Sequence, residues 1–283
     1  MGAEDNATTK EAWPSGHYYS PIPDYEWISE NPNVLQRQRT TIPGIDVNAS
    51  GQIELIAELK KFVTQFDWPQ EKNDERRYYT NNTFYGHGSG FILFSMLMKY
   101  KPKRIIEVGS GFSSALMLDT AELKMGDREV NLTFIEPFPD RLNKLLKGRD
   151  RERCRIIKSF VQHVPIDIFT SLGAGDLLFI DSSHVVKTGS DVLFLYNEVI
   201  PQLAPGVLIH IHDIYWPFEY PSGWLAKRWA WNEAYFLRAL LQNNPSISIL
   251  LFSNYLAQQH KQSLQGLPFG PALTGSTIWL KRT

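Results

Sequence analysis

Apolar positions along the chain follow two patterns, short uninterrupted runs and longer stretches with helical spacing. The short runs predict strands at 104–108, 132–136, 154–158, 176–181, 206–212, 246–252 and 275–281. The longer stretches predict helices at 53–63, 90–100, about 113–124, 138–147, 164–171, 187–203 and 228–242. Strands that alternate with helices are typical of a parallel sheet covered by helices on both faces.

The last predicted strand departs from this alternation. The connection that precedes 275–281 contains Gly and Pro residues and shows no obvious helix. A strand reached without a crossover helix is expected to run antiparallel to its neighbour. We therefore predict a doubly wound, mostly parallel, seven-stranded Rossmann-like α/β sheet with an antiparallel last strand.

The N-terminal segment differs from the rest of the chain in composition. Residues 1–50 are rich in Pro, Asn, Gly and aromatic residues and show no sustained period. We predict an irregular arm over 1–50, which either covers the active site or wraps the surface, and one domain with N-terminal helices over 51–283. Four aromatic residues of a late loop, Tyr215, Trp216, Phe218 and Tyr220, are predicted to form an exposed wall of the substrate pocket.

Composition excludes several classes of partner. The formal net charge of -1 among 283 residues gives no basic footprint for nucleic acid. No apolar run reaches the ~18 residues that span a bilayer, and the start of the sequence does not resemble a signal peptide. Cys154 is the only cysteine, so an intrachain disulfide is excluded. We expect a cytoplasmic enzyme with a small-molecule substrate and without a nucleic-acid or membrane partner; no oligomeric state is predicted.

The strand at 104–108 leads into a glycine-rich turn with two acidic residues near it. Gly109 and Gly111 leave room for a ligand beside the backbone, and the helix that follows directs its first amides toward that ligand. Glu107 would repel a pyrophosphate but suits an ammonium group. Glu136 ends the next strand, 25 residues after Gly111, where an acid can bind ribose hydroxyls. The pattern favours S-adenosylmethionine over NAD, and Ser114 stands where a dinucleotide fold has its third glycine.

Polar residues also follow the later strands, where ligands bind in open parallel sheets. A loop at 160–163 follows the third strand, and Asp181 closes the apolar run of the fourth. His184 follows three residues later, and His212 and Asp213 end the fifth strand. His210 lies inside that strand and is assigned to packing.

Three stretches resemble one bacterial group of small-molecule class I methyltransferases. These are 181–191, 205–221 and 16–23, and the group is similar to macrocin-type sugar O-methyltransferases and to proteins labelled cephalosporin hydroxylase. The resemblance implies the class I methyltransferase sheet and S-adenosylmethionine as the cofactor. It implies these cofactor-binding residues: Glu107, Gly109, Ser110 and Gly111 with Ser114 for the methionine part, Glu136 for the ribose, Gln162 (or its neighbours Val161 and His163) for the adenine, and Asp181 with Ser182 near the transferable methyl group.

The catalytic residues are predicted from the need to deprotonate an acceptor. A hydroxyl or amine must lose a proton, and histidine is suited to accept it. The candidates are His184 and His212 with Asp181 and Asp213. A divalent metal bound by the two aspartates is an alternative that we do not favour, since two carboxylates are few ligands for Mg²⁺.

Two other functions stay open at this point. Asp181, His184 and His212 match the two-His, one-carboxylate pattern of iron oxygenases. The chain can also be a non-catalytic S-adenosylmethionine-binding protein. The intact glycine turn favours the methyltransferase over the oxygenase.

Overall fold

The computed structural model describes residues 12–35, 39–125, 130–270 and 275–283. The chain divides into two compact units. The arm unit consists of Met1–Gln38 and Tyr220–Ala230, and the sheet unit consists of Arg39–Glu219 and Trp231–Thr283. All the predicted site residues belong to the sheet unit. The predicted domain boundary after residue 50 stays a prediction.

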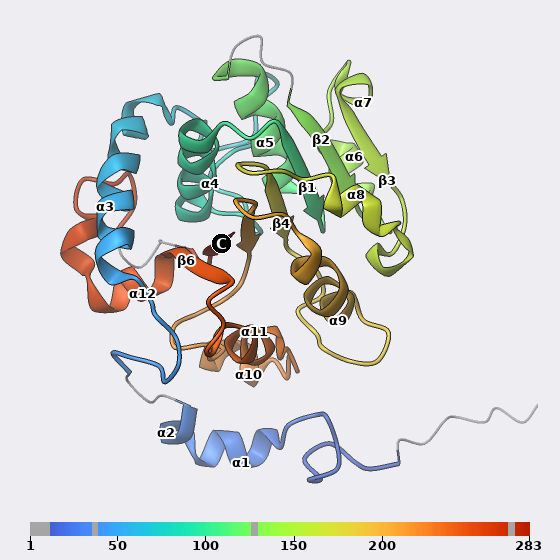
Figure 1. Cartoon of the computed structure of the whole chain (residues 1–283), viewed down its shortest axis with the longest axis vertical. Helices are drawn as coiled ribbons and strands as arrows, with labels where there is room; N and C mark the ends of the chain where they lie inside the picture. Colours follow the sequence, from blue (N-terminus) through green and yellow to red (C-terminus); the bar gives the residue numbers. More distant parts are fainter. Residues whose placement is uncertain (1–11, 36–38, 126–129, 271–274) are drawn as a thin grey trace, which may run out of the picture. The chain divides into compact units, whose positions relative to one another are not determined.

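The sheet unit contains a seven-stranded sheet with the order β3-β2-β1-β4-β5-β7-β6 (Figure 1). The strands are β1 (Arg104–Val108), β2 (Asn131–Ile135), β3 (Cys154–Ile157), β4 (Leu177–Ile180), β5 (Leu208–Ile211), β6 (Ile247–Phe252) and β7 (Ile278–Arg282). β1 to β5 are parallel, and β7 lies antiparallel between β5 and β6. The predicted fold class is confirmed.

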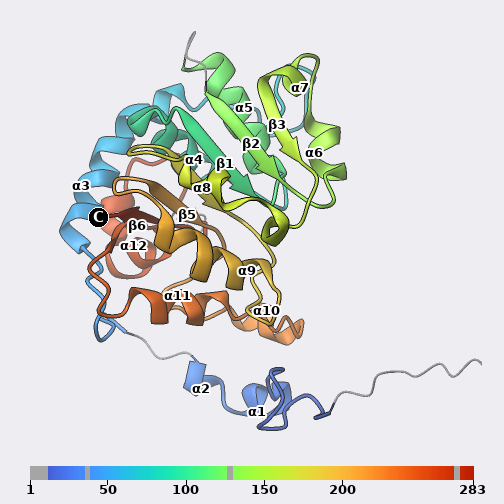
Figure 2. The same cartoon turned by 45° about the vertical axis from the view of Figure 1, so that its right-hand side comes forward.

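Helices cover both faces of this sheet (Figures 1 and 2). One packed group contains α3 (Ala49–Leu59), α4 (His87–Tyr100), α5 (Phe112–Leu123) and α6 (Asp140–Leu145). The other contains α8 (Ile166–Thr170), α9 (Asp191–Phe194), which continues into a π-helical turn (Leu195–Val199), and α11 (Glu233–Leu241). Because both faces are covered, β4 and β5 are buried along their whole length.

Shorter elements complete the described chain. In the sheet unit these are 3-10 helices at Lys60–Gln65, Val161–His163, Ile200–Gln202 and Lys261–Leu264, with α7 (Asp150–Arg153) and α12 (Ser253–Gln259). In the arm unit they are α1 (Tyr25–Glu30), α2 (Pro32–Leu35) and α10 (Ser222–Ala226). No helix in the described ranges is long and apolar enough to cross a membrane.

Two sequence predictions about helices were wrong in detail. The connection between β6 and β7 does contain a helix, α12, which buries Tyr255 and Leu256 but is too short for a visible period. The helix predicted over 187–203 begins only at Asp191, where the Ser190 hydroxyl caps it by accepting a hydrogen bond from the Leu193 amide at 3.2 Å.

The predicted aromatic wall after β5 was also wrong for three of its members. Trp216, Phe218 and Tyr220 are buried rather than exposed. The rings of Trp216 and Phe218 lie against Phe252 at the end of β6, and Trp216 also contacts Tyr255, with ring centroids 4.7 Å apart. Trp216 and Phe218 are therefore part of the core of the sheet unit, because the loop after β5 reaches the end of β6.

Candidate active site

Two cavities open at the carboxyl ends of the parallel strands, where the strand order reverses between β1 and β4. The first has a volume of about 380 Å³ and reaches His184 and His212; we call it the histidine cavity. The second has a volume of about 410 Å³ and reaches Gln162; we call it the glutamine cavity. Glu136 and residues 181–183 line both cavities, which together form one continuous candidate site.

Gly109 is the point where the turn after β1 meets the end of β4. Its φ of 83° lies in the left-handed region. A Cβ atom at this position would lie 1.8 Å from the carbonyl oxygen of Asp181. The β1–β4 register places the two residues side by side, because Val108 is paired with Ile180. The turn therefore requires glycine both for its conformation and for this close approach.

Glu107 lies beneath the turn and is fully buried. Its carboxyl group accepts hydrogen bonds from the hydroxyl groups of Ser113 and Ser114 in the first turn of α5. Burial raises the pKa of Glu107 to about 8, although the two serine hydroxyls favour the charged form. Glu107 and Ser114 do not appear among the described residues that line the two cavities. Their predicted contact with the cofactor stays a prediction, and the structure gives both a role in holding the turn.

Glu136 lies at the end of β2, as predicted, and faces both cavities. One carboxylate oxygen accepts a hydrogen bond from the amide of Ser110 at 3.1 Å, and the other accepts one from the amide of Phe138 at 2.9 Å. These bonds fix the orientation of the carboxylate. Each oxygen keeps lone pairs for the hydroxyl groups of a ligand.

Three buried oxygen atoms of the predicted cofactor-binding residues have no hydrogen-bond partner among the described residues. They are the hydroxyl oxygens of Ser110 and Ser182 and the side-chain carbonyl oxygen of Gln162. The amide nitrogen of Gln162 donates to the carbonyl oxygen of Gly189 at 2.9 Å, which leaves its oxygen for the glutamine cavity. Buried polar groups are rarely left without partners. These atoms therefore fit a polar ligand that occupies the two cavities.

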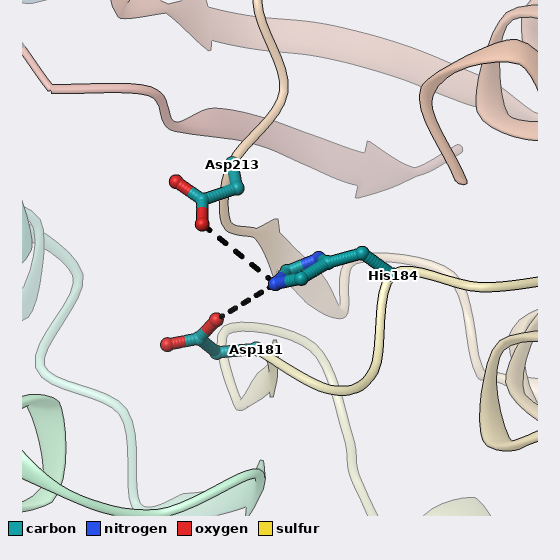
Figure 3. A group of neighbouring side chains, drawn as sticks. All are labelled: Asp181, His184 and Asp213. Carbon is teal, nitrogen blue, oxygen red and sulfur yellow. Dashed lines mark ion pairs between the residues drawn. The ribbon is translucent and has the colours of Figure 1, made fainter. Parts of the chain in front are cut away.

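The histidine cavity brings together Asp181, His184 and Asp213 (Figure 3). The Nε2 atom of His184 lies 3.5 Å from an oxygen of Asp181 and 3.7 Å from an oxygen of Asp213. Figure 3 shows this nitrogen pointing toward both carboxylates. One donor atom from each of the three residues lies within 4.8 Å of the others, a spacing that suits a bound cation.

The charges of the residues in the histidine cavity affect one another's pKa values. Burial disfavours the charged form of His184, but hydrogen bonds to Asp181 and Glu233 raise its pKa well above the usual value. Burial would raise the pKa of Asp181, but the neighbouring His212 and His184 rings hold it below the usual value. The cavity thus favours ionised carboxylates around a histidine that readily takes up a proton.

His212 lies beside this group without joining it. Its Nε2 atom is 3.5 Å from an oxygen of Asp213, and its Nδ1 atom has no hydrogen-bond partner among the described residues. Within the described ranges, the residues whose donor atoms are close enough to hold a metal ion are His184 and the two aspartates, and His212 is not among them. The structure therefore does not assemble the two-His, one-carboxylate arrangement considered from the sequence.

Sequence reasoning missed several residues of the site, among them Glu233 and Tyr85. Glu233, the first residue of α11, is fully buried next to His184. Tyr85 lines the histidine cavity with its ring 4.9 Å from that of His212, and its buried hydroxyl has no partner among the described residues. Tyr85 precedes α4 and Glu233 follows a tryptophan-rich loop, so neither stands at the end of a strand, which was the signal used to select candidates.

Sheet order and site together define a class I methyltransferase fold: six strands that run in one direction, an antiparallel last strand between β5 and β6, and an acid-lined glycine turn after β1. Residues 106–214 match a family model described as a methyltransferase domain. The chain belongs to this methyltransferase family, and it is an enzyme of that class.

An uncharacterised protein of Archaeoglobus fulgidus is 33% identical over 166 residues, which cover 56% of this chain and 73% of the relative. Among solved structures, the SAH-bound Podospora anserina methyltransferase PaMTH1 aligns with a TM-score of 0.46 at 14% identity, over 91% of this chain and 96% of its own. An O-methyltransferase from Bacillus cereus in complex with SAH aligns with a TM-score of 0.43 at 11% identity, over 91% and 97% of the two chains.

Proposed function

We propose that the protein transfers the methyl group of S-adenosylmethionine to a hydroxyl or amine of a small molecule. One observation carries the proposal: the three unpartnered polar atoms of Ser110, Gln162 and Ser182 lie along two joined cavities, on either side of an oriented Glu136. An elongated cofactor with polar groups at both ends and a ribose in the middle would satisfy all four residues.

The cavity lining suggests how the cofactor lies. The glycine turn takes the methionine part and Glu136 takes the ribose hydroxyls. The adenine then enters the glutamine cavity, where the half-exposed Phe160 and the exposed Phe138 meet edge to face with ring centroids 5.9 Å apart. Gln162 offers its free carbonyl oxygen to the adenine amine. The sulfonium consequently lies near Asp181, whose carboxylate stabilises the positive charge.

In this arrangement the protein mainly aligns the reactants, because the sulfonium is already activated for in-line displacement. The acceptor enters the histidine cavity beside the Nε2 atom of His184, and the neutral form of His184, which is populated only above its raised pKa, accepts the proton. Asp181 and Asp213 flank that nitrogen and stabilise the imidazolium that forms. His212 completes the wall of the same cavity.

A divalent cation is the second candidate for this position. The donor atoms of Asp181, His184 and Asp213 fit one, with two carboxylates and an imidazole within 4.8 Å of one another. A bound cation would lower the pKa of an acceptor hydroxyl as a Lewis acid. The chain supplies three ligands in this case, and the acceptor or water would complete the coordination.

Binding of S-adenosylhomocysteine tests the cofactor assignment directly. Calorimetry should show that Glu136→Ala weakens binding by ~1–3 kcal/mol, through lost charge-assisted hydrogen bonds. Glu198→Ala, an exposed glutamate on the π-helical turn, is the matched control and should leave affinity unchanged. Equal affinity of Glu136→Ala and the wild type would reject the placement of the ribose.

Chelation separates the two candidates for deprotonation. With His184 as the base, EDTA should leave turnover unchanged, and added Mg²⁺ or Mn²⁺ should not raise it. Turnover that stops with EDTA and returns with a divalent cation would replace the histidine base by a metal site made of Asp181, His184 and Asp213.

The remaining parts of the proposal rest on composition. A cytoplasmic location and action without nucleic acid or membrane are supported by the near-zero net charge and the single Cys154. An oxygenase is disfavoured because His212 is not among the residues whose donor atoms could hold a metal ion together. A non-catalytic cofactor-binding protein would bind S-adenosylhomocysteine but transfer no methyl group to any compound in a screen of labelled extracts.

A further inference from the structure

We propose that Glu233, itself held by Tyr196, is the positioning residue that sets the tautomer and the orientation of His184. This inference rests on the proposed function, in which His184 accepts the proton of the acceptor. Neither residue lies at the carboxyl end of a strand, and both reach the site from helices: Glu233 from the start of α11 and Tyr196 from the π-helical turn after α9.

The backbone of His184 is fixed by the start of α11. His184 has a φ of 61°, in the left-handed region that few non-glycine residues adopt. Its carbonyl oxygen accepts hydrogen bonds from the amides of Asn232 and Glu233, both at 3.1 Å. The side chain of Asn232 also bonds the amide and the carbonyl of Val186, at 2.6 and 3.2 Å. Four hydrogen bonds therefore tie the histidine turn to one helix terminus.

The ring of His184 is fixed by the same helix. The Nδ1 atom lies 2.8 Å from one carboxylate oxygen of Glu233, and the Tyr196 hydroxyl donates to the other oxygen at 3.0 Å. Glu233 is fully buried and Tyr196 nearly so. The Trp231 ring lies against the imidazole, with centroids 4.4 Å apart. Both carboxylate oxygens are thus engaged, and the glutamate cannot turn away from the histidine.

This geometry selects one tautomer of the neutral imidazole. A carboxylate only accepts hydrogen bonds, so the Nδ1 atom must carry the proton. The lone pair is then on Nε2, the nitrogen that faces Asp181 and Asp213 in the histidine cavity. The other tautomer would place a proton on the reactive nitrogen and leave one oxygen of the buried glutamate without its donor from the imidazole. Orientation of a histidine by a carboxylate at its second nitrogen is a recurrent feature of catalytic sites.

In the proposed step the acceptor loses a proton to the histidine and gains the methyl group. The acceptor hydroxyl transfers its proton to Nε2 of His184, and its oxygen forms a bond to the methyl carbon of the sulfonium. The carbon–sulfur bond breaks with its electron pair on sulfur, which becomes a neutral thioether. His184 becomes an imidazolium whose Nδ1 proton is shared with the Glu233 carboxylate. Glu233 therefore stabilises the charge that forms on the ring without touching the acceptor.

The first test is a double-mutant cycle measured as methyl transfer. Glu233→Gln should lower kcat by roughly 10–1,000-fold with S-adenosylhomocysteine affinity and acceptor KM nearly unchanged, because only the charge and tautomer of His184 change. Tyr196→Phe should lower kcat by about 3–10-fold, the effect of one lost hydrogen bond. In the His184→Ala background, both substitutions should lose their effect on kcat.

Matched controls use residues of the same elements. Tyr235→Phe on α11 removes a tyrosine hydroxyl that donates to the carboxylate of Glu219 at 2.9 Å, and Glu198→Gln removes a charge two residues after Tyr196 on the π-helical turn. Both should leave kcat within twofold of the wild type. A loss with Glu233→Gln that persists in the His184→Ala background would overturn the proposal, since Glu233 would then act on stability rather than through the histidine.

A spectroscopic test does not depend on activity. The Nδ1-bound proton of His184, assigned with His184→Asn, should give a resolved downfield NMR signal in the wild type that disappears in Glu233→Gln. Absence of this signal in the wild type would overturn the proposal even if the enzyme transfers methyl groups. If the signal is present but neither S-adenosylhomocysteine binding nor methyl transfer occurs, the proposed function fails while the orientation of His184 by Glu233 stands. If Glu233→Gln does not fold, Tyr196→Phe in the two backgrounds decides.

Discussion

The glycine turn after β1 and the histidine group after β4 lie next to each other but are held together in different ways. In the turn, the side chains that bond one another are close in sequence: Glu107 accepts from Ser113 and Ser114, six and seven residues later. In the histidine group, His184 bonds Glu233, 49 residues away. A ligand site built from local contacts is visible in the sequence, whereas one built from distant contacts needs the folded sheet.

The two regions also differ in what their acids do. Glu107 is buried with a raised pKa and two hydroxyl donors, which suits a carboxyl group that supports backbone. The carboxylate of Asp181 keeps a lowered pKa beside two histidines, which suits charge stabilisation in the reaction. Two strand-terminal acids of similar appearance in the sequence therefore have different environments, and the four predictions below separate them.

Gly109→Ala should have the largest effect, because Gly109 joins the two regions. The new Cβ atom would lie 1.8 Å from the Asp181 carbonyl oxygen in addition to the cost of a positive φ. The free energy of unfolding should fall by ~3 kcal/mol or more, and S-adenosylhomocysteine binding should be lost. Gly175→Ala has a similar φ of 85° with open space around it and should cost only ~1–2 kcal/mol. Equal losses in urea unfolding would mean that the close approach does not matter.

His184→Ala should disable only the histidine group. Turnover should fall by roughly 10²–10⁴-fold, since a general base is lost, while S-adenosylhomocysteine affinity stays close to that of the wild type. His260→Ala, which lies outside the two site cavities, is the control and should remain active. Steady-state kinetics and calorimetry on the same preparations check both. Weakened cofactor binding in His184→Ala would show that the two regions are not separable.

Glu107 should make the stability of the cofactor-free protein depend on pH. Its folded pKa of about 8 lies above the unfolded value, so the folded state holds a proton that the unfolded state releases. The stability contribution is complete below about pH 4.3 and is lost as pH rises through about 8. The wild type should therefore lose a few kcal/mol relative to Glu107→Gln between pH 5 and pH 8, as measured by urea unfolding. A difference that does not change with pH would contradict the burial of this carboxyl group.

Ser182→Ala should have the smallest effect, and it tests whether the Ser182 hydroxyl contacts the cofactor. Its buried hydroxyl has no partner among the described residues and lies on both cavities. Removal of this hydroxyl should weaken the binding of S-adenosylhomocysteine by about 0.5–1.5 kcal/mol, the value of one hydrogen bond, with little change in the free energy of unfolding. Ser159→Ala, a half-buried serine after β3, serves as the control in the same titration. Unchanged affinity would assign the Ser182 hydroxyl to the acceptor side or to water.

The sequence by itself determined the elements whose evidence is local. The seven strands, the glycine turn, and the acids and histidines at strand ends were all placed within a few residues of their observed positions, because apolar runs and turn chemistry act over short distances. The mostly parallel sheet followed from the alternation of strands and helices, and the antiparallel last strand followed from its departure from that alternation. Gln162 lines a cavity, its predicted contact with the adenine stays a prediction, and its partner Gly189 was not foreseen.

The tertiary structure decided which of these residues meet. Contact of the loop after β5 with the end of β6 buried Trp216 and Phe218, which the sequence presented as part of an exposed wall. Packing of α11 on the π-helical turn brought Glu233 and Tyr196 to His184. The same packing gave Asp181 a charged neighbourhood, while Glu107 was enclosed by α5. Partners so far apart in the chain leave no periodic trace, because their contact exists only after the sheet has formed and buried the apolar faces of its helices.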